Sequence, residues 1–402
     1  MMDTNELQKL VNPVYSTAQG TLLMLAGAGD KDAIALLPHV GIDMNRQVTG
    51  TVPPEINKCF MIGQQARFEM LNNVTLENDA PNVVDLPCGY APRGFRTAAS
   101  GKRYFGFDLP SVIHTMKPAA EKTMTPEQRA LATYAAVDAT NYDSMKKALG
   151  DVKGELCIIM EGMLGYFSES ELVSLCQGIH RLLSEYGGCW ITADVTLLQI
   201  YPLTFKTVFR DNEATLTEFM KSTARNMADV EFYKNSLFLN GKEGAKEFLK
   251  SQGFSVASES VKRFIPDLPN VDKTLMEALR EAYGVMEVMT MRVEKAAKPV
   301  ADKSLPFAVE STFGNGAFNV KIQGRMDTIT APELLKRFQE LPDKATDIEI
   351  DVADMAYVSS AGLRVLLMMY KSLEDKTRFK LLNVNNDVKE ILEVTGFDQF
   401  LL

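Results

Sequence analysis

Two changes in the pattern of apolar and polar positions divide the chain. Residues 1–80 show helical spacing, with candidate helices at 17–37 and 56–72. From Asn82 onward, short β-rich apolar runs alternate with helical stretches, which is typical of a parallel sheet with helices on both faces. The predicted strands of this region span residues 83–86, 104–108, 131–138, 155–160, 189–194 and 254–260.

The second change follows a linker. Residues 197–250 form a more helical insertion, and residues 271–295 have the pattern of one long helix. The stretch EKAAKPVADKSLP has the small, charged and proline-bearing composition of a linker, so we place a domain boundary at 296–304. Residues 305–402 begin a new α/β unit. Strands are expected in FNVKIQGRMD, ending at Gly324, and at 347–352 and 379–384, and helices at 330–341, 361–373 and 387–396, where Gly396 is a candidate C-cap.

Charge balance and cysteine usage narrow the function classes. The chain has 43 basic and 52 acidic side chains, and its net charge of −9 gives no electrostatic reason to bind nucleic acid or an anionic membrane. No apolar run approaches the roughly 18–20 residues that span a bilayer, and the N-terminus lacks a signal-peptide pattern. Five scattered cysteines without a CxxC pair indicate reduced thiols. We therefore expect a cytoplasmic protein without nucleic-acid or membrane partners.

Histidine is scarce. His39, His114 and His180 lie far apart, and the chain has no HExxH motif. A Ser/His/Asp triad or a histidine-rich metal site is therefore disfavoured, and we expect no metal centre.

The stretch VVDLPCGYAPRGF is the first candidate site. It runs from a predicted strand ending near Asp85 into a loop with one glycine, Gly89, and Asp108 ends the next strand 23 positions after Asp85 (108 − 85). This is close to the roughly 20 residues of a nucleotide-binding βαβ unit, yet an ordinary turn explains these features equally well. Pro87 and Cys88 disfavour a dinucleotide, whose pyrophosphate needs glycine-rich backbone amides. S-adenosylmethionine needs only a close approach of the backbone, while an NAD-dependent enzyme stays as a further alternative.

Four blocks in order carry a family resemblance. VVDLPCGYAPRGFR, YFGFDLPSVI, AAVDATNYDSM and IIMEGMLGYFSESEL resemble the leucine carboxyl methyltransferase family and its bacterial small-molecule O-methyltransferase relatives, over about residues 50–295. The family usually has glycine where this chain has Pro87. The resemblance implies an α/β fold with a Rossmann-like class I methyltransferase core at 81–295, a helical N-terminal cap at 1–80, and S-adenosylmethionine as the cofactor.

The resemblance also implies a role for each matching residue. Arg67 matches an arginine that pairs with the cofactor's methionine carboxylate; otherwise it lies on a solvated helix face. Asp138 and Ala139 match the pair that holds the adenine, unless Asp138 only caps a helix. The other matches are Asp85 and Gly89 in the cofactor loop and Asp108 as the acid that binds the ribose hydroxyls.

Glu161 and Tyr166 are the candidate catalytic residues. Glu161 follows a predicted strand, so its carboxylate is expected beside the reacting methyl group, where it stabilises the sulfonium or orients a substrate. The alternative is a helix cap for the segment that begins at Ser168. Tyr166 either lines the methyl-transfer channel or is a packing residue. No catalytic base is evident, and a carboxylate or phenolate acceptor needs little help, because positioning supplies much of the catalysis.

The last hundred residues carry a second resemblance. DMAYVSSAGLRVLL, with GRMDTITAPELL upstream, resembles the STAS domain of bacterial anti-sigma-factor antagonists over about residues 305–402. The resemblance implies that Ser360 is phosphorylated by a partner kinase, and that Asp327 lies near the partner surface. A phosphate at a helix N-terminus is electrostatically tolerated there. The alternative is that Ser359 and Ser360 only cap the helix, and the acidic neighbour found in many phosphorylated members is absent here.

Together these observations predict an S-adenosylmethionine-dependent methyltransferase joined to a STAS regulatory module. The expected methyl acceptor is a carboxylate or hydroxyl on a small molecule or a protein. The expected STAS partner is a protein of the anti-sigma-factor or kinase type. The alternative is a non-catalytic signalling protein whose first domain senses the cofactor or is vestigial.

Overall fold

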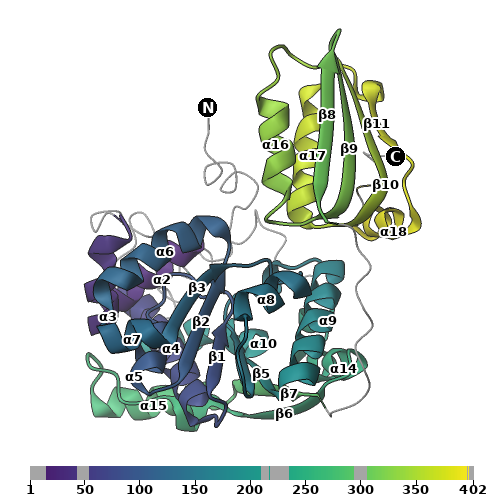
Figure 1. The fold of residues 1–402 in the computed structure, drawn as a ribbon. Helices are drawn as coiled ribbons and strands as arrows, with labels where there is room; N and C mark the ends of the chain where they lie inside the picture. The colour runs from purple at the N-terminus through teal and green to yellow at the C-terminus, as the bar shows by residue number, and fades with distance from the viewer. Residues whose placement is uncertain are drawn as a thin grey trace. The chain divides into compact units, whose positions relative to one another are not determined.

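The computed structural model describes residues 15–42, 54–209, 217, 235–293, 306–395 and 397 (Figure 1). The chain divides into two compact units. The larger contains Ser16–Asp108 and Val112–Ala296, and the smaller contains Ala297–Leu402 with two short additional segments. The predicted linker at 296–304, most of the insertion between 210 and 234, and Gly396 lie outside the described residues.

The larger unit is built on a seven-stranded sheet of order β3-β2-β1-β4-β5-β7-β6. Strands β1 to β5 are parallel, as the sequence pattern predicts, whereas β7 runs antiparallel to both β5 and β6. The order 3-2-1-4-5 is that of a doubly wound Rossmann-like sheet, so this fold prediction is confirmed. The strands are β1 Asn82–Asp85, β2 Arg103–Asp108, β3 Ala132–Ala136, β4 Leu156–Met160, β5 Gly188–Thr192, β6 Ser255–Ser260 and β7 Glu287–Arg292.

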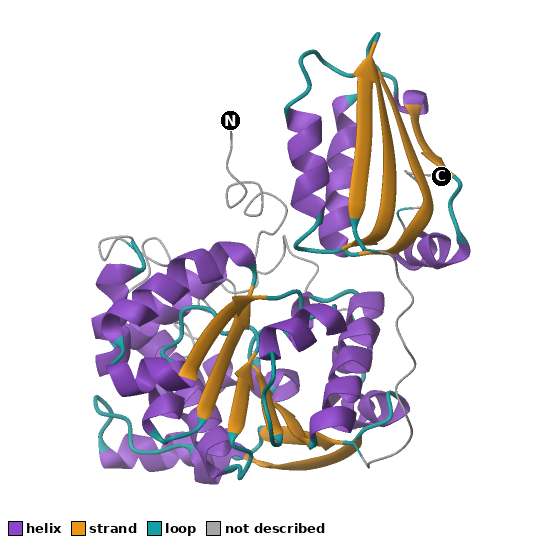
Figure 2. Cartoon of the chain, in the orientation of Figure 1, coloured by secondary structure: helices purple, strands orange, loops and turns teal. Residues whose placement is uncertain are grey.

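Helices cover both faces of this sheet (Figure 2). Helix α5 packs on β2 and β3, α4 packs against α5 and α11, and α8 packs against α9. The helices are α2 Tyr15–Gly27, α3 Lys31–Leu36, α4 Pro54–Glu77, α5 Arg93–Ala99, α6 Pro110–Thr123, α7 Pro126–Leu131, α8 Tyr142–Leu149, α9 Glu169–Tyr186, α10 Asp194–Leu197, α11 Ile200–Val208, α13 Ser236–Leu239, α14 Gly241–Ser251 and α15 Lys273–Tyr283.

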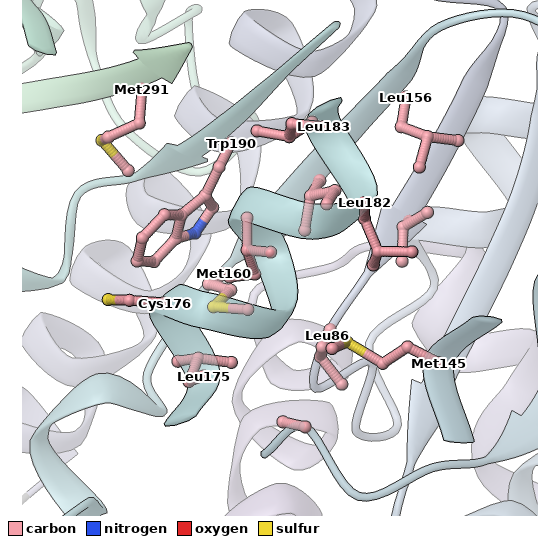
Figure 3. Packing of buried hydrophobic residues seen from close by; sticks show 14 of the residues in the cluster. Leu86, Met145, Leu156, Met160, Leu175, Cys176, Leu182, Leu183, Trp190 and Met291 are labelled. Carbon is pink, nitrogen blue, oxygen red and sulfur yellow. The ribbon is translucent and has the colours of Figure 1, made fainter. Parts of the chain in front are cut away.

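The core of the larger unit lies between the sheet and helices α8, α9 and α14. The single tryptophan, Trp190 of β5, is fully buried there. Figure 3 shows its indole among Met160 from β4, Cys176 from α9 and Met291 from β7. Its fluorescence therefore reports on the packing of this unit.

Two helix predictions in the larger unit are wrong. The segment predicted as one helix at 17–37 is divided between α2 and α3, because Gly29 adopts a left-handed conformation and the Asp30 carboxylate starts α3 by accepting from Ala33 N at 2.8 Å. The segment predicted as one helix at 271–295 contains two elements: its first part forms α15, and its later part forms β7. Its apolar positions also fit a strand, and pairing with β5 and β6 decides between the two.

The smaller unit is a four-stranded sheet of order β11-β10-β9-β8, with α16 and α17 packed together beside it. β10 is parallel to β9 and β11, and β8 pairs antiparallel with β9 through a hairpin that the sequence analysis missed. The elements are β8 Ala308–Gly314, β9 Ala317–Met326, α16 Ala331–Gln339, β10 Asp347–Val358, α17 Ser360–Ser372, β11 Phe379–Leu382 and α18 Asn386–Thr395.

Candidate functional site

Four acidic residues lie at the carboxyl edge of the larger sheet. Asp85 is the last residue of β1, Asp108 is the last of β2, Asp138 follows β3 by two residues, and Glu161 directly follows β4. Because these strands are neighbours in the order β3-β2-β1-β4, their ends meet at one edge. The order reverses between β1 and β4, and such switch points are where doubly wound sheets bind their ligands.

The loop after β1 joins two of the predicted residues. Gly89 N donates to Asp108 Oδ2 at 2.7 Å, and Cys88 N donates to Phe107 O at 2.9 Å. Gly89 has a φ of +51°, and a side chain added there would meet Ala18 of α2 at 3.8 Å. These two amides are occupied within the protein and Pro87 has none, so residues 87–89 offer no amide for a pyrophosphate.

Asp85 faces inward from the loop. Its Oδ2 accepts from Arg93 Nε at 3.1 Å and from the Tyr104 hydroxyl at 2.9 Å, and its side chain is 2% exposed. Burial raises the pKa of Asp85 to about 6, although Arg93 and Tyr104 oppose this shift. Asp85 therefore supports the loop through Arg93.

Glu161 lies between two arginines. Its Oε1 accepts from Arg67 Nε and its Oε2 from Arg93 Nη2. Burial alone would raise the pKa of Glu161, but the two guanidinium groups outweigh it and lower the pKa. The alternative that Glu161 caps α9 is wrong, because Ser168 is the N-cap and forms a capping box with Glu171.

Arg67 is on the site face of α4 and is not on a solvated surface. Its side chain is 18% exposed, against 1% for Arg93. Gly162, with a φ of +71°, lies directly beside Arg67 Nη2, and a Cβ at this position would collide with that nitrogen. Because Gly162 has no side chain, the Arg67 guanidinium fits beside it.

Asp138 shapes the turn that follows β3. Its Oδ1 accepts from Thr140 N at 2.8 Å and from Thr140 Oγ1 at 2.6 Å. Helix α8 is capped by Asn141, so the helix-cap alternative for Asp138 is wrong. Ala139 is buried within this turn, beside the end of β2, where Val137 N donates to Asp108 O at 2.9 Å.

Asp194 is a site residue that the sequence analysis missed. It was predicted as the last residue of a strand, but β5 ends at Thr192 and Asp194 begins α10. Its carboxylate accepts from Gly162 N at 2.7 Å and from Met163 N and Leu164 N at 3.0 Å. Burial raises the pKa of Asp194, and these three amides oppose the shift. Asp194, which follows the neighbouring strand β5, therefore holds the segment after Glu161 in place.

Tyr201 and Gln64 extend the site toward α11, and sequence reasoning gave no signal for either. Tyr201 donates to Gln64 Oε1 at 2.8 Å. Burial raises the pKa of Tyr201, while the positive charge of Arg67 lowers it and the charges of Glu161 and Tyr166 raise it. Half-buried Tyr166, in the 3-10 turn Leu164–Tyr166, thus belongs to the same cluster.

Arg93 is the fourth residue that was missed. It contacts Asp85, Glu161 and Asn72, whose Oδ1 accepts from Arg93 Nη1 at 2.7 Å. The motif APRGFR contained the signal, but a sequence does not show which arginine is buried.

In the smaller unit, the two predicted regulatory positions, Ser360 and Asp327, lie in neighbouring segments of the chain's fold. Ser359 N donates to Met326 O at 3.0 Å, which joins the start of α17 to the residue before Asp327. Ser359 caps α17, its hydroxyl accepting from Gly362 N at 3.3 Å. Ser360 is the first residue of α17, and its side chain lies outside the described part of the chain.

Asp327 is 2% exposed, and its Oδ1 accepts from Ile329 N and Thr330 N at 3.0 Å. Its carboxylate therefore shapes the loop before α16 and presents little surface to a partner.

Comparisons with known proteins identify the smaller unit. The family model described as Mlab, STAS domain matches residues 312–402. The anti-sigma-B factor antagonist of Staphylococcus aureus (strain NCTC 8325 / PS 47) is 25% identical over 95 residues, which are 23% of this chain and 88% of that protein. The anti-sigma-B factor antagonist of Bacillus subtilis (strain 168) is 26% identical over 83 residues, 20% of this chain and 76% of that protein. The C-terminal unit is a STAS domain.

Solved structures that match the chain include methyltransferases. Magnesium protoporphyrin IX methyltransferase from Synechocystis PCC 6803, with bound S-adenosylhomocysteine, is 12% identical, with 65% of this chain and 95% of that chain covered and a TM-score of 0.36. An O-methyltransferase family protein from Burkholderia thailandensis is 11% identical, with 60% and 62% covered and a TM-score of 0.34.

Within the described residues, no helix combines the length and apolar character needed to cross a membrane. The same residues contain no group of three or more histidine, cysteine or acidic side chains placed to hold a metal ion.

Proposed function

We propose that the larger unit binds S-adenosylmethionine and transfers its methyl group to an oxygen acceptor, and that the STAS domain links this activity to a protein partner. The observation that supports this most is the row of acids at the ends of β3, β2, β1 and β4, with Asp108 joined to the Gly89 loop. An acid at the end of the second strand of such a sheet is suited to bind ribose hydroxyls.

The sheet itself favours a ligand with one nucleoside. Dinucleotide-binding sheets contain two parallel βαβαβ halves, one for each nucleotide. Here β1, β2 and β3 complete one half, whereas β4 and β5 are followed by the antiparallel pair β6 and β7. This supports an adenosine cofactor without a second nucleotide and disfavours NAD.

The described residues fit the amino-acid end of such a cofactor. The Arg67 side chain is 18% exposed, and the buried Gln64 Nε2 has no hydrogen-bond partner among the described residues. In this proposal Asp108 holds the sugar, Asp138 and Ala139 border the base, and Arg67 pairs with the methionine carboxylate.

Bound S-adenosylmethionine would supply an activated methyl group, so the protein's task is to bind, orient and exclude water. Both oxygens of Glu161 are engaged by Arg67 and Arg93. Glu161 therefore positions Arg67 and keeps a negative charge near the site, without serving as a free base. Tyr166, in the same segment, borders the acceptor side.

Calorimetry with S-adenosylmethionine and S-adenosylhomocysteine tests the binding step. Wild-type protein should bind both, NAD should give no heat, and Asp108→Ala should weaken binding about 10- to 100-fold, since hydrogen bonds to a charged group are lost. Asp151→Ala, which removes an exposed acid in a turn, is the control. Absence of heat with either ligand would refute the proposal.

Transfer is tested with cofactor carrying a labelled methyl group and a panel of carboxylate and hydroxyl compounds. Label in an acceptor identifies a methyltransferase. Binding without transfer to any member favours the alternative, a cofactor sensor attached to a STAS switch, for which the absence of a free carboxylate at Glu161 is the supporting observation.

The proposed role of Ser360 is tested separately. Phosphorylation would place about −1.5 to −2 charges at the start of α17, beside the Asp327 loop. Ser360→Asp should change turnover or the binding of a protein partner relative to Ser360→Ala. If the two variants behave alike in both measurements, Ser360 does not couple the domains.

A further inference from the structure

Asn235 is a buried amide that ties the start of α13 to the turn after β4. It directly precedes α13 and is 2% exposed. Its Nδ2 donates to Leu164 O at 2.9 Å and to Phe167 O at 2.8 Å, and its Oδ1 accepts from Leu237 N at 3.2 Å. Because carbonyl oxygens only accept hydrogen bonds, these partners fix which atom of the amide is the nitrogen.

The two carbonyl groups that Asn235 binds lie on either side of the candidate catalytic tyrosine. Leu164 precedes Tyr166 by two residues and Phe167 directly follows it, so Asn235 fixes the backbone on both sides of Tyr166. From the other direction, the Asp194 carboxylate accepts from the three amides of residues 162–164. The turn is therefore held through its amides from α10 and through its carbonyl groups from the start of α13.

Tyr166 belongs to the cluster at the end of β4. Its side chain is half-buried, and its charge, together with that of Glu161, raises the pKa of Tyr201. An aromatic ring at this edge suits a sulfonium ligand, because the negative face of the ring attracts a cation that lies over it. The placement of the Tyr166 ring therefore affects the group that carries the transferable methyl.

We propose that Asn235 is a positioning residue for methyl transfer, which holds the Tyr166 ring against the sulfonium and its methyl group. The proposal rests on the proposed function and extends it by a residue that does not itself touch the ligand. Its two carbonyl partners lie 71 and 68 positions away along the chain, so the junction at α13 influences the end of β4 only in the folded protein. A displacement of about 1 Å near a reacting group can cost about 100-fold in rate, which gives such a residue its effect.

Asn235 also caps α13, and suitable variants separate this role from the positioning of Tyr166. Asn235→Ser keeps a side-chain oxygen that accepts from Leu237 N, but it removes the amide that donates to both carbonyl groups. Asn235→Ala removes the cap as well. If the cap alone mattered, Asn235→Ser would behave as wild type.

Calorimetry of the full chain with S-adenosylmethionine and S-adenosylhomocysteine measures the effect, because these ligands differ by the methyl group and its positive charge. Asn235→Ser should weaken S-adenosylmethionine binding about 2- to 30-fold, the usual range for losing a contact between a cation and a ring, and should leave S-adenosylhomocysteine binding unchanged. Tyr166→Ala should show the same selective loss. The double variant should lose no more than Tyr166→Ala alone, because Asn235 acts through that ring.

Glu169→Ala is the matched control. Glu169 Oε2 accepts from Ser236 N at 2.8 Å, so this variant removes another contact at the start of α13 and leaves the carbonyl groups beside Tyr166 untouched. It should bind both ligands as wild type does. Trp190 fluorescence verifies that each variant is folded, and Asn235→Thr, which keeps the cap oxygen and more of the volume, replaces Asn235→Ser if that variant does not fold.

Three results would overturn the positioning role: wild-type affinity of Asn235→Ser or Tyr166→Ala for S-adenosylmethionine, an equal loss for both ligands, or additive losses in the double variant. Failure of the wild-type protein to bind S-adenosylhomocysteine would instead refute the proposed function, and this proposal with it.

Discussion

Asp85 makes a prediction about stability that needs no ligand. Its carboxyl is 2% exposed, and burial raises its pKa to about 6, from an ordinary value of 3.8, against the opposing influence of Arg93. Below about pH 4 the group is protonated in both the folded and the unfolded protein. Between pH 4 and 6 the folded protein keeps a proton that the unfolded chain has released. Raising the pH through this window therefore favours unfolding.

The size of the effect follows from the shift. Each pKa unit corresponds to about 1.4 kcal/mol, so a shift of roughly two units gives about 3 kcal/mol between pH 4 and pH 7. Asp85→Asn removes the titrating group and keeps a side chain of similar shape. Relative to wild type, this variant should gain about 3 kcal/mol of unfolding free energy as the pH rises from 4 to 7. Subtracting the unfolding free energy of the wild type from that of the variant at each pH cancels the contributions of all other titrating groups.

Urea unfolding followed by Trp190 fluorescence at several pH values measures this difference, because Trp190 lies in the core of the same unit. Asp151→Asn, at an exposed turn, controls for the loss of one negative charge and should run parallel to wild type. If the difference between Asp85→Asn and wild type is flat across this range, Asp85 stays ionised and Arg93 outweighs burial, contrary to our reasoning.

Three further outcomes are expected. Arg93→Met should lower the unfolding free energy by about 3–5 kcal/mol in the Trp190 assay, because it removes the cation that two buried carboxylates, Asp85 and Glu161, share. Gly162→Ala and Gly150→Ala both put a side chain at a positive φ, so each variant should lose about 1–2 kcal/mol of unfolding free energy. Only Gly162→Ala places that side chain against Arg67, so only this variant should weaken S-adenosylhomocysteine binding in calorimetry. Ser359→Ala should cost about 1 kcal/mol and speed hydrogen exchange at the start of α17; unchanged exchange would contradict the cap.

Much of the strand edge was predictable. Short apolar runs bounded by turns identified β1, β2 and β4, so the positions of Asp85, Asp108 and Glu161 at strand ends followed from the sequence. The 23-residue spacing between Asp85 and Asp108 favoured a nucleotide-type loop, and in the structure that loop reaches Asp108 through Gly89 N. Local patterns suffice here because each of these parallel strands is a short apolar run that a helical segment separates from the next strand.

Other features required the tertiary structure. The segment of β7 carries a pattern that fits a helix or a strand, and its pairing with β5 decides the outcome. Asp194 lies 33 positions after Glu161 (194 − 161), yet it accepts from the amides that follow Glu161. Such long-range pairs leave no periodic trace in a sequence.

The sequence by itself predicted two α/β units and the acids at the strand ends, because these follow from periodicity and turn residues, while the STAS assignment came from the resemblance that DMAYVSSAGLRVLL and GRMDTITAPELL carry. Only the tertiary structure decided that Glu161 bridges Arg67 and Arg93, that Asp85 is turned inward, and that the Gln64 amide nitrogen finds no acceptor among the described residues. The physical reason is burial: charge pairing and unsatisfied hydrogen bonds acquire their energies from neighbours that only folding brings within reach.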